Sequence, residues 1–331
     1  MRKILYLSVL LFGGLIFNGC TKDSDIFTPD PGQITGPDDT WYTTVTAAMP
    51  VNLLRNSLTF TADKDSFDIV NTNYTVAFAS GLECTFPGSP FVDNNGIVTT
   101  GKVQLESYLL KKKGDLIRMS KPTVSNNRML ISGGSVFIQA KKDGVKLKLG
   151  TDKKIKLHYT NDAYISSAMK LFNPDDVNPD PQLFNWLQCS DTLNGNNKVV
   201  PFSGGYDIYT NRLQWLNCNY FYNIGASDSV KISLTLPTNF TNANTVSYVI
   251  SNDEVSVLGM SADVASKKFI SSALPGGKSV RVISITKEGN FYYLGHNSFV
   301  TNKPSDGRYQ NVNINPTRLS LEAIKDFLNN L

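Results

Sequence analysis

The chain has 331 residues, of which 41% are hydrophobic and 11% aromatic, and its formal net charge is +4. This composition supplies enough apolar side chains for packed cores, and the length is enough for two or three domains. Beyond the N-terminal segment no apolar run approaches 18 residues, which excludes a further membrane-spanning helix.

The N-terminal residues have the pattern of a signal peptide. Arg2 and Lys3 give a positive start, and the apolar run 4–17 is too short to cross a hydrocarbon core of about 30 Å as a helix. We therefore expect residues 1–19 to be a leader that is removed.

The pair Gly19-Cys20 resembles the lipobox of bacterial lipoproteins. In that class the cysteine sulfur receives a diacylglycerol, and the chain is cut just before it. The resemblance implies a mature chain that begins at Cys20 and is held at a membrane by palmitate-type acyl chains, each buried CH₂ contributing about 0.8 kcal/mol. An ordinary membrane anchor or an unmodified cysteine is the alternative.

The residues after Cys20 carry a second resemblance. Thr21-Lys22-Asp23-Ser24-Asp25 is similar to the Lys-plus-acidic export signal of surface lipoproteins of Bacteroidota, which implies an outer-membrane lipoprotein exposed at the cell surface. The periplasmic leaflet is the alternative location. Residues 22–39 hold three prolines, two glycines and five aspartates, so we expect residues 20–40 to be a flexible tether.

From residue 41 onward, short alternating runs recur every 8 to 12 residues, which is typical of β-sandwiches or barrels. We predict strands over 103–110 and 129–140, the latter interrupted by Gly133-Gly134, where we expect a β-bulge or a close backbone approach. These strands belong to a first, basic β-sandwich-like module over residues 41–160.

The clearest predicted hairpin has strands over 145–149 and 155–159, with apolar side chains inward and cationic ones outward. Residues 102–156 carry 14 Lys or Arg against four acids, a net charge of +10. The outward lysines are a candidate patch for an anionic glycan, lipopolysaccharide phosphates or an acidic partner; they are Lys146, Lys148, Lys154 and Lys156. Lysines that protect sheet edges and keep the surface soluble are the alternative.

Residues 161–224 are predicted to connect two modules. Residues 173–181 contain three prolines and break regular structure, and an aromatic-rich stretch follows. Exposed rings there are candidates for stacking on sugars: Trp186, Trp215, Tyr220 and Tyr222. Core packing is the alternative. Alternation places Trp215 and Phe221 on one face, and Tyr220 and Tyr222 on the other.

The cysteines other than Cys20 are Cys84, Cys189 and Cys218. A disulfide between Cys189 and Cys218 is one expectation in an oxidising compartment, and buried free thiols are the other.

Residues 225–331 are predicted to form a C-terminal β-sandwich-like module. Its candidate strands are 229–236, 245–251, 254–258, 279–286 and 290–294, with a hairpin turn at 287–290. A short helix over 321–330 ends the chain, with Ser320 as its N-cap. The predicted fold is therefore mainly β, with two antiparallel β-sandwich-like modules.

Three segments resemble an uncharacterised group of Bacteroidota surface proteins: GKVQLESYLL (101–110), MLISGGSVFIQAKKDGVKLKL (129–149) and RLQWLNCNYF (212–221). The resemblance implies a β-rich architecture over residues 95–331 and no particular chemistry. Asn219 stands where the group's motif has Asp.

Motifs for catalysis are not found. His158 and His296 lie in different modules outside any ligand-spaced cluster, and there is no G-x-S-x-G elbow or P-loop. The acids and amides of residues 175–180 lack the order of a calcium loop. We expect neither a metal nor another cofactor, and no nucleic-acid partner.

The leading hypothesis is a non-enzymatic, lipid-anchored protein of the cell envelope with a binding, adhesion or scaffold role. A glycan-binding lipoprotein for polysaccharide capture and an envelope hydrolase are the alternatives.

Overall fold

The computed structural model describes residues 38–331 apart from 163–164, 177–183, 193–195, 226–227 and 306–308. Asp39–Leu331 forms a compact unit distinct from Met1–Asp38. The predicted leader, Cys20 and most of the predicted tether lie outside the described residues. In the described part of the chain, no helix is long and apolar enough to cross a membrane.

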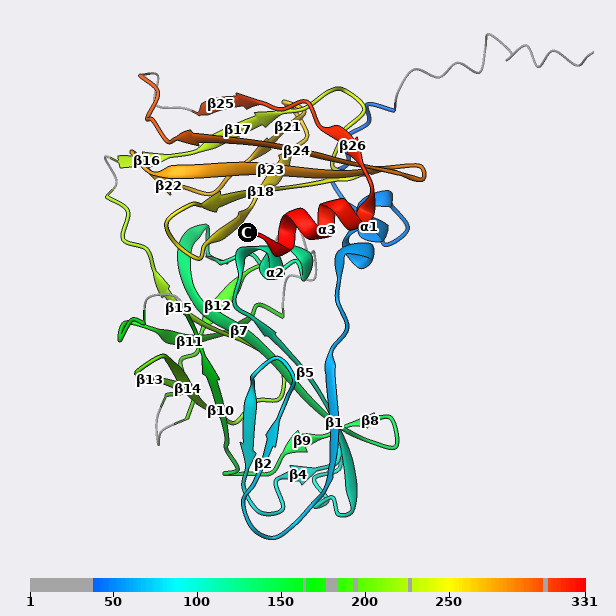
Figure 1. The fold of residues 1–331 in the computed structure, drawn as a ribbon, viewed down its shortest axis with the longest axis vertical. Coiled ribbons are helices and arrows are strands. Elements are labelled where there is room, and N and C mark those ends of the chain that lie inside the picture. Colours follow the sequence, from blue (N-terminus) through cyan, green and yellow to red (C-terminus); the bar gives the residue numbers. More distant parts are fainter. Residues whose placement is uncertain (1–37, 163–164, 177–183, 193–195, 226–227, 306–308) are drawn as a thin grey trace, which may run out of the picture. The chain divides into compact units, whose positions relative to one another are not determined.

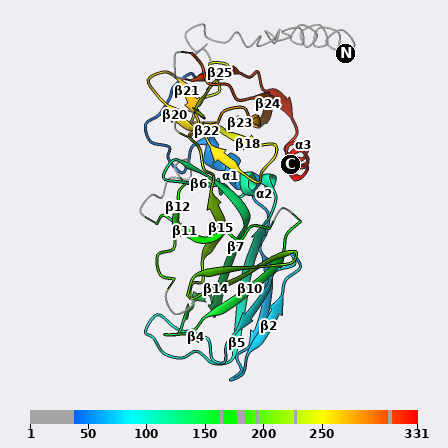
Figure 2. The same cartoon turned by 90° about the vertical axis from the view of Figure 1, so that its left-hand side faces the viewer.

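The compact unit is mainly β, as the sequence predicts, and nearly all of its strand pairs are antiparallel. Its sheets form a lower and an upper sandwich, which Figures 1 and 2 show one above the other. We call them the first and second sandwich, in chain order.

The first sandwich contains two facing sheets. In spatial order, the first sheet contains β1 (Asp63–Asp68), β5 (Lys102–Leu110), β7 (Arg128–Lys142), β15 (Trp215–Phe221), β11 (Lys170–Pro174) and β12 (Trp186–Gln188), with β6 (Val124–Ser125) and β8 (Val145–Lys146) paired to β7. The second sheet contains β13 (Lys198–Phe202), β14 (Gly205–Thr210), β10 (Ile155–Thr160), β3 (Glu83–Phe86) and β2 (Tyr74–Ala77). A separate short ladder joins β4 (Phe91–Val92) to β9 (Lys148–Leu149).

The core of the first sandwich lies between these sheets. Alternate residues of β5 and β7, such as Leu105 and Ile138, are buried against alternate residues of β10 and β14, such as Leu157 and Ile208. Because side chains alternate across a strand, the intervening residues face outward. Burial of large aliphatic side chains contributes about 1.5–3 kcal/mol each.

Gly133 forms a β-bulge in β7, as the sequence predicts. The register of β15 skips Gly133, since Cys218 pairs with Gly134 and Asn219 pairs with Ser132. A Cβ on Gly133 would lie 2.8 Å from Tyr206 Cε2, so only glycine permits this close approach. The bulge frees the Gly133 carbonyl, which accepts hydrogen bonds from Tyr159 Oη (3.1 Å) and Asn161 Nδ2 (2.7 Å).

The second sandwich is built in the same way from the C-terminal strands. One sheet contains β20 (Ser261–Asp263), β21 (Lys268–Ile270), β17 (Ile232–Thr235) and β25 (Gln310–Asn313). The other contains β19 (Val257–Gly259), β18 (Thr245–Ser251), β23 (Ser279–Glu288), β24 (Phe291–Val300) and β26 (Thr317–Leu319). β16 (Ser229–Val230) pairs with β22 (Leu274–Pro275), and β17 pairs with β25 in parallel. The predicted turn at 287–290 joins β23 to β24.

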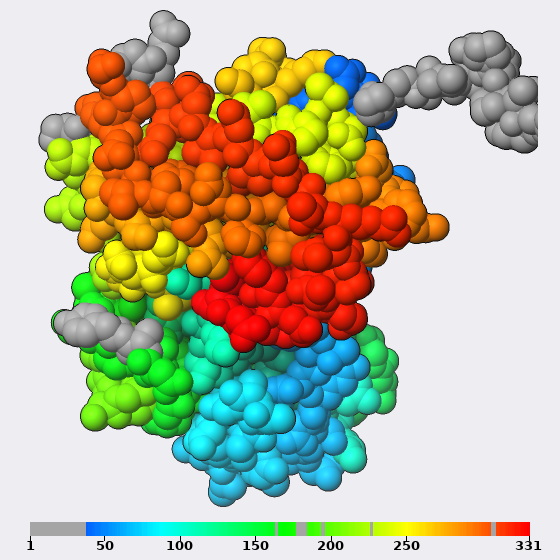
Figure 3. All heavy atoms as spheres, turned by 45° about the horizontal axis from the view of Figure 1, so that its top comes forward, coloured from blue at the N-terminus to red at the C-terminus, as the bar shows by residue number. Residues whose placement is uncertain are grey.

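Helices cover the lower face of the second sandwich, where it meets the first. They are α1 (Pro50–Leu58), α2 (Lys113–Arg118) and α3 (Leu321–Asn329). Figure 3 shows α3 (red) between the two sandwiches. Apolar helix residues such as Leu54, Leu116 and Ile324 pack against β18, β23 and β24. The predicted cap is confirmed, because Ser320 Oγ accepts a hydrogen bond from the backbone N–H of Ala323.

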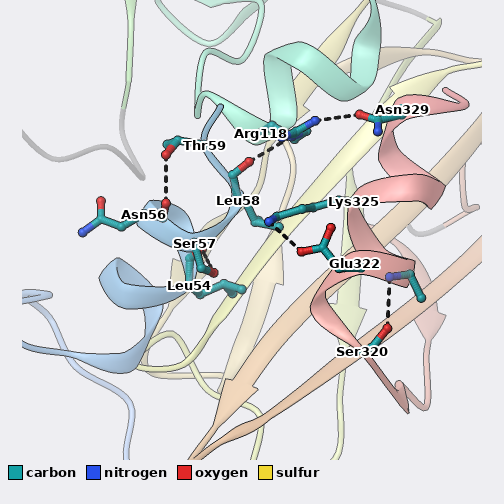
Figure 4. Close-up of polar contacts among 11 residues, drawn as sticks. Leu54, Asn56, Ser57, Leu58, Thr59, Arg118, Ser320, Glu322, Lys325 and Asn329 are labelled. Carbon is teal, nitrogen blue, oxygen red and sulfur yellow. Dashed lines mark hydrogen bonds and ion pairs between the residues drawn. The ribbon is translucent and has the colours of Figure 1, made fainter. Parts of the chain in front are cut away.

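Arg118 ties the three helices together. Its Nε donates to the carbonyl oxygen of Leu58, where α1 ends (2.9 Å), and its Nη1 donates to Oδ1 of Asn329 in α3 (2.7 Å). Figure 4 shows Arg118 reaching both helices. The guanidinium also lies 4.9 Å from the ring centroid of Phe60.

The sheets do not follow the predicted module boundaries. Residues 161–224, predicted as a connecting segment, supply strands to both sheets of the first sandwich. Conversely α1, within the predicted first module 41–160, packs on the second sandwich. The sandwiches contact each other directly, since Thr123 N–H donates to the carbonyl oxygen of Val257 (2.6 Å) and Val257 N–H donates to Thr123 Oγ1 (2.9 Å).

The predicted hairpin over 145–159 is wrong. Lys148 in β9 pairs with Val92 in β4, whereas Lys156 in β10 pairs with Thr85 in β3 and Tyr209 in β14. The alternation of apolar and polar residues predicts which face of a strand is buried, but not which strand it pairs with. Both edges of β10 pair with strands that are remote in sequence, β3 and β14. The proposed four-lysine patch is therefore divided between different sheets.

Of the two expectations for Cys189 and Cys218, a disulfide or buried free thiols, the disulfide does not form, because β11 separates the two thiols. Leu171 in β11 pairs with Cys218 on one side, and its carbonyl oxygen accepts a hydrogen bond from Cys189 N–H on the other. Two strand spacings place the cysteine Cα atoms about 10 Å apart, beyond the limit of about 7 Å for a disulfide. Cys84, Cys189 and Cys218 are buried free thiols.

Candidate ligand-binding cleft

A tight hairpin turn places two amide side chains at the junction of the sandwiches. Ser125 in β6 pairs with Arg128 in β7, so Asn126 and Asn127 form a two-residue turn. Their φ angles are 48° and 61°. A two-residue turn with both φ values positive is the type I′ geometry, and asparagine tolerates it better than most residues do.

A second hairpin, formed by β11 and β12, lies beside this turn. Its strand pairing extends past Pro174, because Asp175 N–H donates to the carbonyl oxygen of Asn185 (2.9 Å). The Asn185 side chain links both hairpins: Nδ2 donates to Asn126 Oδ1 and Asp175 Oδ2, each at 3.1 Å, and Oδ1 accepts from Asn126 N–H (2.7 Å). β6, β11 and β12 lie together beneath the second sandwich in Figure 2.

These hairpins form one wall of a cleft of about 270 Å³ between the sandwiches. The first sandwich and the linker before β6 supply Pro122, Val124, Asn126, Asn127, Asp175, Phe184 and Asn185. The second sandwich supplies Gly259, Ser261 and Ser272. The volume is close to the lower end of the range of about 300–1,000 Å³ for small-molecule sites.

The lining is rich in groups that both donate and accept hydrogen bonds. Asn127 is exposed, and its amide has no hydrogen bond among the described residues, so its two donors and its acceptor are available to a ligand. Ser261 is exposed and Ser272 is half-buried. Asp175 is the carboxylate among the described lining residues, and one of its oxygens accepts a hydrogen bond from Asn185.

One aromatic ring, that of Phe184, lines the cleft and packs against a buried aromatic ring. Phe184 packs edge-to-face on Trp186, with their ring centroids 4.9 Å apart. Lys121 Nζ lies 4.2 Å from the Phe184 ring centroid and 5.1 Å from that of Trp215. Burial lowers the pKa of Lys121 to about 8 because it penalises the charged ammonium.

The predicted stacking residues do not line this cleft. Trp186 is fully buried, and its Nε1 donates to the carbonyl oxygen of Pro122 (2.8 Å), so its proposed role in stacking on sugars is wrong. Trp215 is half-buried and stacks on Tyr108, with ring centroids 5.7 Å apart. Tyr220 and Tyr222 pack against the core of the second sandwich, on the face opposite to Trp215, as alternation predicts.

The four predicted lysines lie in different environments. Lys146 in β8 and Lys148 in β9 are exposed, while Lys154 is half-buried. Lys156 forms an ion pair with Asp207, with Nζ 2.9 Å from Oδ2, and this contact raises its pKa.

The histidines lie outside the cleft. His158 Nδ1 is 2.7 Å from Asp207 Oδ1, and its ring stacks on Phe202. His296 stacks on Phe327 of α3. Among the residues that the structure describes, no group of three or more His, Cys, Asp or Glu side chains is placed to hold a metal ion. Residues 178–180 of the candidate calcium loop lie outside the described residues.

Asn126, Asn127 and Asn185 are not among the candidate residues predicted from the sequence. An Asn-Asn pair between alternating runs is a hairpin signal that could have indicated the turn. No local signal indicates that Asn185, 59 residues away from Asn126, would hydrogen-bond to it. No protein-family model and no curated protein matches the chain.

Proposed function

We propose that this protein is a lipid-anchored, non-enzymatic binding protein of the cell envelope, and that the cleft between its sandwiches holds a short segment of an uncharged glycan. The proposal joins the expected lipidation of Cys20 and surface location with the chemistry of the cleft. In this account the protein belongs to the Bacteroidota-type surface lipoproteins that its motifs resemble.

The composition of the cleft lining is the observation that carries the glycan proposal. Sugar hydroxyls donate and accept hydrogen bonds at once, and so do the amide of Asn127 and the hydroxyls of Ser261 and Ser272. The Asn185 amide positions the wall instead, because both of its N–H donors are used by Asn126 and Asp175. The Phe184 ring offers an apolar surface to the C–H face of a sugar. The side chains of the described lining include one carboxylate and no cation, which favours an uncharged ligand.

The test is a glycan array, followed by calorimetry with the oligosaccharide that binds best. The protein used is Asp39–Leu331, the compact unit that contains the described cores. The informative variant is Asn127→Gly, because glycine keeps the positive φ of the turn and removes only the amide. We expect Asn127→Gly to weaken binding by about tenfold, since one or two hydrogen bonds are lost.

The matched control is Asp143→Gly. Asp143 and Gly144 form the same kind of two-residue turn at the other end of β7, with φ angles of 49° and 80°. This variant should bind like the wild type. Equal affinities for Asn127→Gly and wild type would contradict the cleft as the site.

An envelope hydrolase is the second candidate, because Asp175 brings a carboxylate into the cleft. One oxygen of Asp175 is occupied by the Asn185 amide, an arrangement that suits a structural acceptor. We therefore expect binding without turnover. New reducing ends from the same oligosaccharide, lost in Asp175→Asn, would support the hydrolase instead.

A further inference from the structure

The lower end of the first sandwich carries an apolar surface that the cleft does not explain. Ile97, Val98 and Val145 are 65%, 57% and 52% exposed. We call the turn at residues 93–98, the turn at residues 142–146 and Lys148 the tip. Figure 1 shows β4, β8 and β9, the strands of this region, in the lower part of the first sandwich, away from the second sandwich, with β8 at the right-hand side.

The strand ladders bring the two turns together. Val98 forms a bridge with Val92, and Val92 pairs with Lys148. Lys142 pairs with Val145, and its Nζ donates to the carbonyl oxygen of Thr100 (2.7 Å). The β4–β9 pair therefore joins the turn at residues 93–98 to Lys148, and the bond from Lys142 to Thr100 joins it to the turn at residues 142–146.

The turn that displays Ile97 is held in a defined conformation. Asp93 Oδ1 accepts hydrogen bonds from the N–H groups of Asn95 (2.8 Å) and Ile97 (2.9 Å), and Asp93 N–H donates to the carbonyl oxygen of Ile97 (3.0 Å). A turn that is fixed in this way presents its side chains at little further entropic cost on binding.

The charge of the tip is positive overall, with three lysines against two aspartates. Lys146 and Lys148 are exposed and Lys142 is half-buried. Asp143 is exposed, whereas Asp93 is half-buried and accepts hydrogen bonds within its own turn. Lys146 and Lys148 have no ion-pair partner among the described residues. Lysines beside exposed apolar side chains match the surface of a lipid bilayer with anionic headgroups. The apolar side chains can enter the headgroup region while the ammonium groups stay beside the phosphates.

We propose that the tip contacts a lipid bilayer whose headgroups are anionic, with Ile97, Val98 and Val145 entering the headgroup region and Lys146 and Lys148 facing the lipid phosphates. A soluble polyanion would use the lysines alone and would leave the three apolar side chains in water. The proposal is independent of ligand binding in the cleft.

The test is co-sedimentation of Asp39–Leu331, which lacks Cys20 and its lipid, with vesicles. Vesicles of phosphatidylcholine are compared with vesicles that contain 30% phosphatidylglycerol as the probe. We expect binding to the anionic vesicles only, and weaker binding as salt increases because exposed charges are screened. The variant Ile97→Ser/Val98→Ser should bind about tenfold more weakly, and Lys146→Gln/Lys148→Gln about fivefold more weakly for each lysine removed.

Matched controls lie elsewhere on the molecule. Val300→Ser removes a side chain that is 50% exposed on the second sandwich, and Lys64→Gln/Lys231→Gln removes two other exposed lysines. These variants should bind like the wild type, and urea unfolding checks that every variant is folded. Equal binding to neutral vesicles, or wild-type binding by Ile97→Ser/Val98→Ser, would overturn the proposal. Wild-type binding by the serine variant together with lysine-dependent binding of soluble polyphosphate would show adsorption of a polyanion instead.

Discussion

Asn185 and Asn126 hydrogen-bond to each other twice, through Asn185 Nδ2 to Asn126 Oδ1 (3.1 Å) and through Asn126 N–H to Asn185 Oδ1 (2.7 Å). This pair joins the β6–β7 turn to the β11–β12 hairpin, and both hairpins line the cleft. The position of Asn127 in the wall of the cleft therefore depends on Asn185, which is remote in sequence and is bonded to the neighbouring Asn126.

Replacing Asn185 by Ala should reduce both stability and ligand binding. The substitution removes the bonds to Asn126 and Asp175, so we expect the free energy of unfolding to fall by about 1–2 kcal/mol. Urea denaturation measures this change. Asn127→Gly should change the stability by less than about 0.5 kcal/mol while weakening binding. Equal stability losses in the two variants would contradict the role assigned to Asn185.

Replacing Gly133 by Ala should destabilise the first sandwich. An added Cβ would lie 2.8 Å from Tyr206 Cε2 and 2.9 Å from Met169 Cε, and overpacking of this kind costs about 1–3 kcal/mol. Gly259→Ala is the control, because its added Cβ would lie 3.7 Å from the nearest atom, Pro122 Cγ. Thermal unfolding should separate the two variants. A Gly133→Ala protein as stable as Gly259→Ala would show that the bulge does not need glycine.

Lys121 should make stability depend on pH in alkaline solution. Its pKa is about 8 in the folded protein and about 10.4 in an unfolded chain. The folded state therefore loses this proton first, and the contribution of Lys121 to stability becomes more favourable as the pH rises from about 8 to about 10.5. At pH 7 we expect Lys121→Met to be more stable than wild type by on the order of 2–3 kcal/mol.

The difference in the free energy of unfolding between Lys121→Met and the wild type should shrink towards zero near pH 10.5. Urea unfolding at pH 7, 8.5 and 10 measures this trend. Lys102→Met gives the control for replacing a lysine by methionine at an exposed position. A pH-independent advantage of Lys121→Met would mean that the Lys121 pKa is unshifted.

The thiols of the compact unit should all be reduced and unreactive in the folded protein. Burial raises the pKa of Cys84, Cys189 and Cys218, so little thiolate is available to a thiol reagent. Without reductant, we expect no reaction in native buffer and reaction of all three thiols in guanidinium. Reaction of a single thiol in guanidinium would reveal the Cys189–Cys218 disulfide.

The features that sequence could predict are those with a local cause. Gly133-Gly134 indicates a bulge because a Cβ is incompatible with the close approach of two strands, and Ser320 indicates a helix start because its side chain caps the first turn. The alternation from Trp215 to Tyr222 predicts which rings share a face.

The features that sequence could not predict depend on remote partners. Alternation over 145–159 gave the buried positions but not the partners β3, β4 and β14, since a period of two is compatible with any neighbouring strand. The cleft was missed for the same reason. Its walls come from two sandwiches, and the link between Asn126 and Asn185 exists only once β11 and β12 have joined the sheet.

A crystal structure of Asp39–Leu331 with the oligosaccharide that binds best on the array would test the central claim most directly. We predict a sugar ring in the cleft, within hydrogen-bond distance of the Asn127 amide and with one face against Phe184. A sugar bound elsewhere, for example on the face that carries Trp215 and Tyr108, with the cleft holding only water, would contradict it.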